Sequence, residues 1–197
     1  MTLPSLRATI AMLILLALIG PASWFIGRAL ADAAADGDLL ASDRLETVGV
    51  WSTHASLGAA EGDPILRAWV ARTAILPLAG GEVAYFWTTR TTTGAALNPD
   101  CAYEVTVPQP DARWWSISTY DDRYRPIANA IERYSVNSRA GVSRFTVSRT
   151  PPDDQTAWLP LGEAVSFELF FRVYQPGPGF DARAETSMPA VREIGPC

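Results

Sequence analysis

Residues 113–121 read Arg-Trp-Trp-Ser-Ile-Ser-Thr-Tyr-Asp, a stretch rich in aromatic and β-branched side chains. This composition favours a β-strand. Successive side chains of a strand point to opposite faces, so Trp114 and Trp115 cannot both enter one core between two sheets. One of them must be covered by a helix, lie at a domain edge, or meet a ligand or partner.

From Glu82 onward, short β-rich runs alternate with glycine, proline, asparagine and aspartate. This texture is typical of a meander or sandwich and not of alternating βαβ units. A further short strand at 48–53 is predicted to begin the folded domain. The main strands are predicted at 82–91, 102–107, 113–120, 131–137, 143–148, 165–174 and 188–194, and the turns at 93–100, 109–112, 121–126, 151–155 and 176–179.

A helix of about three turns is predicted to begin at Asp63-Pro64, which supplies an N-cap acceptor and a proline at the first helical position. Pro77 and Gly80-Gly81 end it. Its apolar stripe, which includes Ile65, Trp69 and Val70, should pack on a face of the sheet.

Five motifs stand in a fixed order and spacing: RWWSISTYD (113–121), RYSVN (133–137), WLP (158–160), FRVYQP (171–176) and MPAVR (188–192). Together they resemble the bacterial family catalogued as domain of unknown function 1214 (DUF1214), in a short membrane-anchored form. The resemblance covers roughly residues 63–197. It implies an antiparallel β-sandwich or jelly-roll-like domain with one packed helix, exported or tethered to a membrane, and it brings no agreed catalytic residues.

The N-terminal segment 8–26 has 19 residues without a charge, which is close to the minimum for a transmembrane helix. Arg7 precedes it and acidic residues follow it, so the charge bias places the N-terminus in the cytoplasm. We therefore expect a single-pass inner-membrane protein whose domain faces the periplasm. The expected organisation is an anchor or signal segment at 1–28, a tether at 29–47 and a β-rich domain at 48–197.

Two alternatives to an uncleaved anchor remain open. Ala29-Leu30-Ala31 is a plausible cleavage site before Asp32, and cleavage there would release a periplasmic or secreted domain. A buried core helix is the other reading. The length of the apolar run, and Trp24 and Phe25 near its outer end, favour the anchor.

The formal charge excludes one class of partner. Every cation is an arginine, and without Arg7 and Arg28 the chain keeps 14 arginines against 21 acidic residues, a balance of −7. Phosphate binding needs a basic surface, so nucleic acid is not expected to bind. The expected partners are the membrane, through the N-terminal segment, and a small molecule, glycan or envelope protein.

Cys101 and Cys197 are the two cysteines. In an oxidising compartment, this pair predicts one disulfide that ties the C-terminal residue to the sheet. Two cysteines and one histidine supply too few soft ligands for zinc, so no metal and no cofactor is expected. A free reactive thiol is the minority alternative.

The chain lacks the common nucleophilic motifs. His54 is the one histidine and is predicted to lie at a strand end or on the surface, and no Gly-x-Ser-x-Gly elbow is present. Adjacent acids occur at Asp121-Asp122 and Asp153-Asp154, where turn hydrogen bonds explain them more simply than catalysis or calcium binding.

A binding cleft is predicted from strand periodicity. Strand 165–174 should bury Phe167, Leu169, Phe171 and Val173 and turn Glu168, Phe170, Arg172 and Tyr174 to the other face. Arginines beside aromatic rings can hold an anion while the rings stack on a sugar or acyl chain. The candidate ligand-binding residues are Trp114, Trp115, Tyr120, Arg133, Ser135, Asn137, Arg172 and Tyr174. In the simpler alternative, Arg172 pairs with Glu168, and the polar residues at 133–137 satisfy neighbouring loops.

These observations favour a non-catalytic binding module at the cell envelope. The first alternative is a hydrolase that acts on a glycan or ester through carboxylates such as Asp121 and Glu168, and it requires two acids in one concave site. The second is a structural subunit of an envelope complex, which would present a large flat apolar patch.

Overall fold

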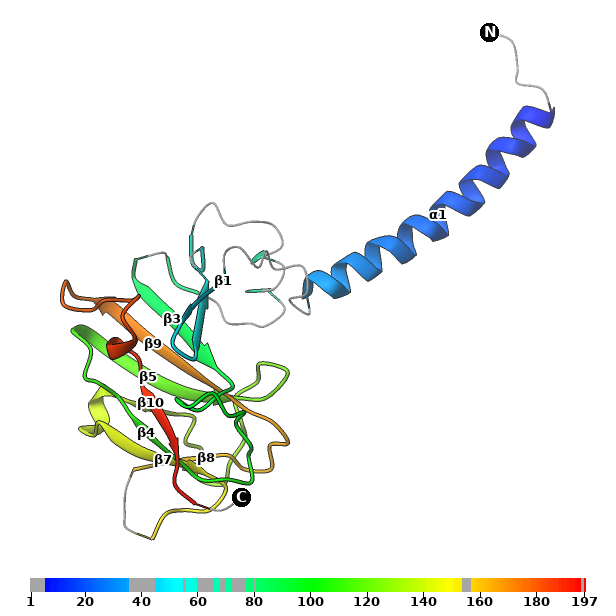
Figure 1. Cartoon of the computed structure of the whole chain (residues 1–197). Coiled ribbons are helices and arrows are strands. Elements are labelled where there is room, and N and C mark those ends of the chain that lie inside the picture. Colours follow the sequence, from blue (N-terminus) through cyan, green and yellow to red (C-terminus); the bar gives the residue numbers. More distant parts are fainter. Residues whose placement is uncertain are drawn as a thin grey trace.

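The computed structural model describes residues 6–35, 45–54, 56–59, 66–67, 70–71, 77–79, 81–153, 157–195 and 197. In these residues the mainly β prediction is confirmed: a long N-terminal helix precedes ten strands in two sheets (Figure 1). The helix is α1 (Leu6–Ala35). The strands are β1 (Leu45–Val48), β2 (Trp51–His54), β3 (Val83–Thr88), β4 (Tyr103–Thr106), β5 (Ala112–Tyr120), β6 (Ser135–Asn137), β7 (Arg144–Ser148), β8 (Trp158–Pro160), β9 (Glu168–Pro176) and β10 (Ala190–Glu193), with short 3-10 helices at Ser138–Ala140 and Glu185–Ser187.

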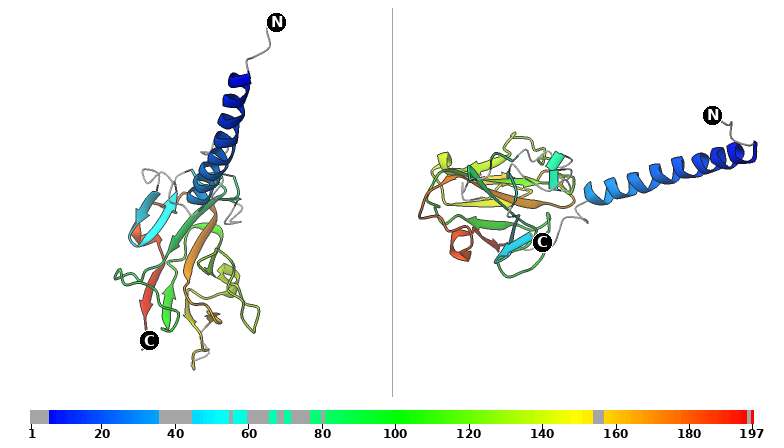
Figure 2. Two further views of the ribbon diagram at one scale, coloured as in Figure 1. Left: turned by 90° about the vertical axis from the view of Figure 1, so that its right-hand side faces the viewer. Right: turned by 90° about the horizontal axis from the view of Figure 1, so that it is seen from above.

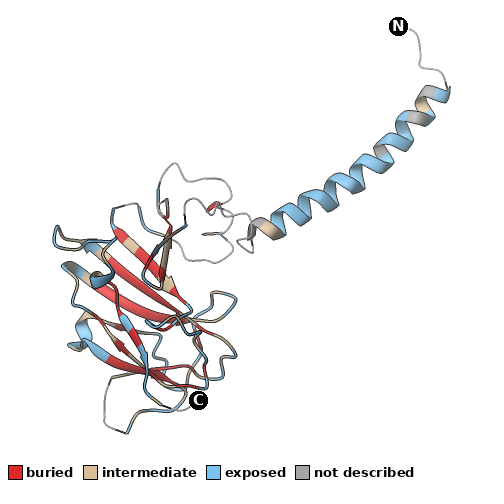
Figure 3. Ribbon diagram, viewed as in Figure 1, coloured by how far each residue is buried: buried red, intermediate tan, exposed pale blue. Residues whose placement is uncertain are grey.

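The larger sheet has the strand order β1-β2-β3-β9-β5-β6, and the smaller has the order β10-β4-β7-β8. Every pair is antiparallel except β7 with β8. The two sheets share one hydrophobic core, to which Phe171 and Ile117 contribute from the larger sheet and Phe145 and Val105 from the smaller. The inner faces of the strands are accordingly buried (Figure 3).

The predicted alternation along β9 is confirmed. Phe171 and Val173 lie in the shared core, whereas Tyr174 packs in a second cluster on the outer face of the larger sheet. Alternation in β5 separates the two tryptophans in the same way. Trp115 is only 2% exposed in the core, and Trp114 lies on the outer face beside Tyr174.

All seven strands predicted from residue 82 onward are present, with shorter or shifted ends. The strand predicted at 48–53 is wrong, because this segment spans a hairpin between β1 and β2. Gly49 turns the chain there with a φ of 60°, a left-handed conformation that glycine adopts without steric penalty. Strand β8 was not predicted. His54 ends β2 as expected, but it is buried and its Nδ1 accepts a hydrogen bond from the Ser56 amide.

The helix predicted from Asp63 is described only in part. Leu66, Arg67, Val70 and Ala71 are helical, and Leu66 and Val70 pack against the outer face of β3. The predicted cap at 63–64 and Trp69 lie outside the described residues.

Helix α1 projects away from the two sheets in all three views (Figures 1 and 2). Its segment Met12–Ala33 is long and apolar enough to cross a membrane, and none of it is buried. By length and composition alone, this segment fits either an anchor or a signal sequence. Part of the predicted tether belongs to this helix, because α1 continues to Ala35.

The predicted disulfide is present. It joins Cys101, just before β4, to Cys197, across a sequence separation of 96 residues. It therefore ties the C-terminal residue to the smaller sheet, in which β10 and β4 are neighbours.

Candidate functional site

The outer face of the larger sheet carries a row of aromatic rings. Trp87 stacks on Phe170 with ring centroids 5.9 Å apart, and Tyr120 meets Phe170 edge-on at 5.1 Å. The middle of this face is covered, since Phe170 is 1% exposed. Beside it, four side chains from outside the sheet pack in one cluster with Val83, Tyr85 and Trp87 of β3: Leu57, Leu66, Val70 and Tyr124.

The ligand cleft predicted from the sequence is not assembled as expected. Trp115 is in the core, and Arg133 donates to the Trp158 carbonyl of the other sheet at 2.8 Å. Ser135 and Asn137 lie on β6 opposite Ser118 and Ser116 of β5. Strand β5 stands between β6 and β9, so the polar residues of β6 are not next to those of β9.

Arg172 has a different partner from the one considered in the sequence analysis. Its Nη2 donates to Tyr120 Oη at 2.9 Å, and its guanidinium carbon lies 5.2 Å from the ring centres of both Tyr120 and Phe170. The side chain is 8% exposed. It is therefore a buried cation that contacts the rings of Tyr120 and Phe170 and the Tyr120 hydroxyl. No ion pair joins it to Glu168.

Carboxylates converge in a pocket at the end of β9. Because Tyr120 lies opposite Glu168, the turn after β5 meets the start of β9. The cavity there has a volume of about 250 Å³. We call it the acidic pocket, and its lining residues are Thr89, Asp121, Asp122, Tyr124, Ser166, Phe167 and Glu168.

Asp121 is fully engaged in its own turn. Its Oδ1 accepts from the amides of Arg123 and Arg125, each at 2.9 Å, and its Oδ2 accepts from Nε and Nη2 of Arg125 at 2.9 and 2.7 Å. Burial would raise the Asp121 pKa, but the hydrogen bonds from Arg125 and the two amides outweigh it and hold this pKa below its ordinary value. The turn explanation for this acid is supported.

The pKa of Glu168 is shifted in the opposite direction. Burial, and secondarily the negative charge of Asp121, raise its pKa to about 8, so its carboxyl is protonated at neutral pH. Its Oε1 atom is fully buried and has no hydrogen-bond partner. Buried polar atoms are nearly always paired, and an unpaired one destabilises the fold unless a ligand or water satisfies it.

The acidic pocket thus combines a protonated carboxyl, an ionised carboxylate that is already bound, and the exposed Asp122. A neutral carboxyl can donate one hydrogen bond and accept others, which suits hydroxyl or amide groups. Asp121 and Glu168 were predicted from the sequence as possible catalytic acids, whereas Thr89, Tyr124 and Ser166 were not predicted. Of these, Tyr124 has a positive φ of 58°, which could not be predicted from the local sequence.

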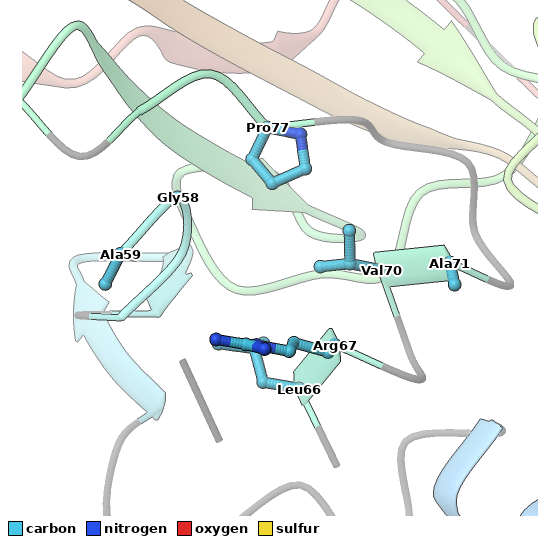
Figure 4. A pocket seen from close by; sticks show the side chains of 7 residues that line it. All are labelled: Gly58, Ala59, Leu66, Arg67, Val70, Ala71 and Pro77. Carbon is cyan, nitrogen blue, oxygen red and sulfur yellow. The ribbon is translucent and has the colours of Figure 1, made fainter. Parts of the chain in front are cut away.

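A larger and mostly apolar pocket lies near the helical pieces at 66–71 (Figure 4). It measures about 440 Å³, and Arg67 is the one ionisable residue among its described lining residues, which are Gly58, Ala59, Leu66, Arg67, Val70, Ala71 and Pro77. These residues supply few groups that could orient a polar ligand or perform acid–base chemistry.

One candidate metal cluster appears among the described residues, formed by Cys101, Glu193 and Cys197. Both of its sulfur atoms belong to the disulfide and are therefore not available as thiolate ligands. Of the second predicted acid pair, Asp153 lies in a turn, and Asp154 is outside the described residues.

No curated protein matches the chain. The crystal structure of the VPA0106 protein from Vibrio parahaemolyticus is similar with a TM-score of 0.52 and 18% identity, over 68% of this chain and 36% of that one. An uncharacterized protein from Burkholderia cenocepacia gives a TM-score of 0.41 and 17% identity, over 61% and 32% of the two chains. This chain spans about a third of the length of both proteins, and the first similarity supports the fold alone.

The sequence also matches a family model. The matched segment, 82–178, runs from just before β3 to just after β9, and so contains both strands of the candidate site as well as the turn after β5. The resemblance predicted from the motifs is confirmed over this segment. Residues 82–178 of this chain match the model of the family described as protein of unknown function (DUF1214).

Proposed function

We propose that this protein is a binding module of the cell envelope, whose acidic pocket takes a small, neutral, hydroxyl- or amide-bearing ligand. The observation that carries the proposal is the buried and unpartnered Oε1 of Glu168 inside a cavity. A ligand that hydrogen-bonds to this oxygen would remove the destabilisation caused by an unsatisfied buried polar group.

The lining of the pocket supports a small neutral ligand. Thr89 and Ser166 carry hydroxyls, and Phe167 and Tyr124 offer ring surface. The cavity volume of about 250 Å³ lies below the usual range for drug-sized ligands. At about 30 Å³ per water molecule, it corresponds to about eight waters. A protonated Glu168 provides no negative charge to attract a cation, and Asp121 is already neutralised by Arg125.

Hydrolysis by paired carboxylates is the second candidate, because two acids with opposite protonation states line one pocket. Such a difference is what a general acid and its ionised partner require. Glu168 would protonate the leaving group. Asp121 is a poor base or nucleophile because Arg125 and two amides occupy its oxygens, so Asp122 would have to serve as the second carboxylate.

The envelope location is part of the proposal. Support comes from the exposed apolar helix Met12–Ala33 and from the disulfide, since disulfides persist mainly in oxidising compartments. In this arrangement α1 anchors the chain in the inner membrane, and the domain faces the periplasm.

Native mass spectrometry of the full-length protein, extracted from its own membranes in mild detergent, tests both the membrane anchor and the bound ligand. We expect the mass of the intact chain less two hydrogens, plus a small molecule that is lost in Glu168→Leu and kept in Glu163→Gln. Glu163 is exposed and provides a matched loss of one carboxylate. A mass that begins at Asp32 would contradict the anchor, and a bare domain in the wild type would contradict the ligand.

A panel of chromogenic glycosides and esters tests the second candidate separately. Turnover that disappears in both Glu168→Gln and Asp122→Asn would replace the binding module by a hydrolase. Turnover that survives in Glu168→Gln would exclude this pocket as a catalytic site.

A further inference from the structure

We propose that a second pocket, at the far end of β9 from Glu168, binds a pyranose ring of a neutral glycan. The pocket measures about 240 Å³, enough for about eight water molecules and so for one small ring. We call it the aromatic pocket. Its lining residues are Leu78, Glu82, Arg113, Trp114, Tyr174 and Gln175.

Two rings form its apolar surface. Trp114 of β5 and Tyr174 of β9 are register partners, and their ring centroids lie 4.6 Å apart with planes inclined at 53°. Both side chains are half-buried, so parts of the rings remain accessible. Tryptophan and tyrosine combine a large rigid apolar face with a polar tip, which suits a ligand that has C–H faces and hydroxyl edges.

Planar polar groups surround the rings. Arg113 Nη1 donates to Gln175 Oε1 at 3.2 Å, which uses one of the five guanidinium N–H donors. The amide group of Gln175 and the carboxylate of Glu82 add further donors and acceptors. Arg113 and Glu82 carry one formal charge of each sign, so the site favours a neutral polyol over an anion or a cation.

The backbone of Gln175 provides an independent observation. Its φ of 46° lies in the left-handed region, which glycine adopts freely and which is strained for other residues. Strand alternation would place Gln175 on the same side as Val173, in the core, yet Gln175 is exposed and lines the pocket. Its backbone N–H donates a hydrogen bond to the carbonyl oxygen of Glu82 at 2.6 Å. A residue whose backbone is kept in an unfavourable conformation beside a pocket indicates a role for its side chain.

Each of the two pockets is lined by a non-glycine residue with a positive φ. Four non-glycine residues have positive φ among the described residues, and two of them line these pockets: Tyr124 in the acidic pocket and Gln175 in the aromatic pocket. The two sites are distinct, because the buried Phe170 and Arg172 separate Glu168 from Tyr174 along the same face of β9.

The test is isothermal titration of the full-length protein in mild detergent with maltotetraose and with chitotetraose, both at millimolar concentration, alongside tryptophan fluorescence. We expect binding of at least one of these neutral glycans, with a change in fluorescence. Trp114→Ala should weaken binding about tenfold or more, whereas Trp114→Phe should keep most of it. Glu163→Gln, at an exposed residue that lines neither of the two pockets, is the control and should leave glycan binding unchanged.

Gln175→Gly is the sharpest variant, because folding and binding should respond in opposite directions. Relief of the backbone strain should leave thermal stability unchanged or raise it, while the loss of the amide should reduce affinity severalfold. Binding of neither glycan would overturn the proposal, as would binding that survives in both Trp114→Ala and Gln175→Gly.

Discussion

Replacement of Glu168 by glutamine should change how the stability of the fold depends on pH. Glutamine keeps the size and polarity of a protonated glutamate but cannot ionise. In the folded wild type the carboxyl has a pKa of about 8, against an ordinary value of 4.5. The difference of 3.5 pKa units, at 1.36 kcal/mol per unit, amounts to about 5 kcal/mol of unfolding free energy.

The sign follows from the protonation states. Below pH 4.5 both the folded and the unfolded chain carry a protonated Glu168, so ionisation imposes no penalty. As the pH rises from 4.5 to 8, the unfolded chain ionises and the folded chain does not, which stabilises the unfolded state. Above pH 8 the penalty is complete and constant. Wild-type stability relative to Glu168→Gln should therefore fall steadily across this interval.

Urea unfolding of the full-length protein in mild detergent, followed by tryptophan fluorescence at a series of pH values, measures this difference. Glu163→Gln is the matched control and should run parallel to the wild type. A wild-type stability that stays at a constant distance from Glu168→Gln between pH 5 and 9 would refute the assignment of a protonated buried carboxyl. Titration of the side-chain carboxyl by ¹³C NMR reports the same pKa directly.

Three further outcomes are expected. Asp121→Asn should lower the pKa of the buried carboxyl in the acidic pocket, because it removes a nearby negative charge, and NMR titration detects the change. Reduction of the bond between Cys101 and Cys197 should lower the free energy of unfolding by about 4 to 5 kcal/mol in the chain-entropy model, as measured by urea unfolding with and without reductant. In the same assay Trp115→Ala should cost about 3 to 5 kcal/mol and Trp114→Ala clearly less, since Trp115 is in the core and Trp114 is half-buried.

The strands with strong alternation could be predicted from sequence. Strands β5 and β9 each have one face in the shared core, so the period of two in their side chains reports burial directly. Hairpin β1–β2 was missed because its tight turn falls within a run that looks like one strand. Strand β8 has three residues, ends in a proline and pairs in parallel with β7, so little in its local sequence indicates pairing.

The candidate site was less predictable, because it depends on which strands are neighbours. The acids Asp121 and Glu168 were both named, but their meeting requires β5 to pair with β9 in a register that places Tyr120 opposite Glu168. The predicted cleft would bring the polar faces of β6 and β9 together, whereas β5 lies between these two strands. Neither the pKa of Glu168 nor the positive φ of Gln175 has a local sequence signal.

The outer face of the larger sheet explains why both candidate pockets lie at its ends. An aromatic face exposed along its whole length would be a large apolar patch, which monomeric proteins rarely show. Here Leu57, Leu66, Val70 and Tyr124 pack against outer-face side chains that include Val83 and Tyr85, and Tyr120 and Phe170 hold the buried Arg172. One pocket lies where β9 begins and another where it ends, and polar side chains from a turn or a distorted strand end line each of them. Variants at Glu168 and beside Tyr174 should therefore alter the proposed ligand binding while the shared core stays intact.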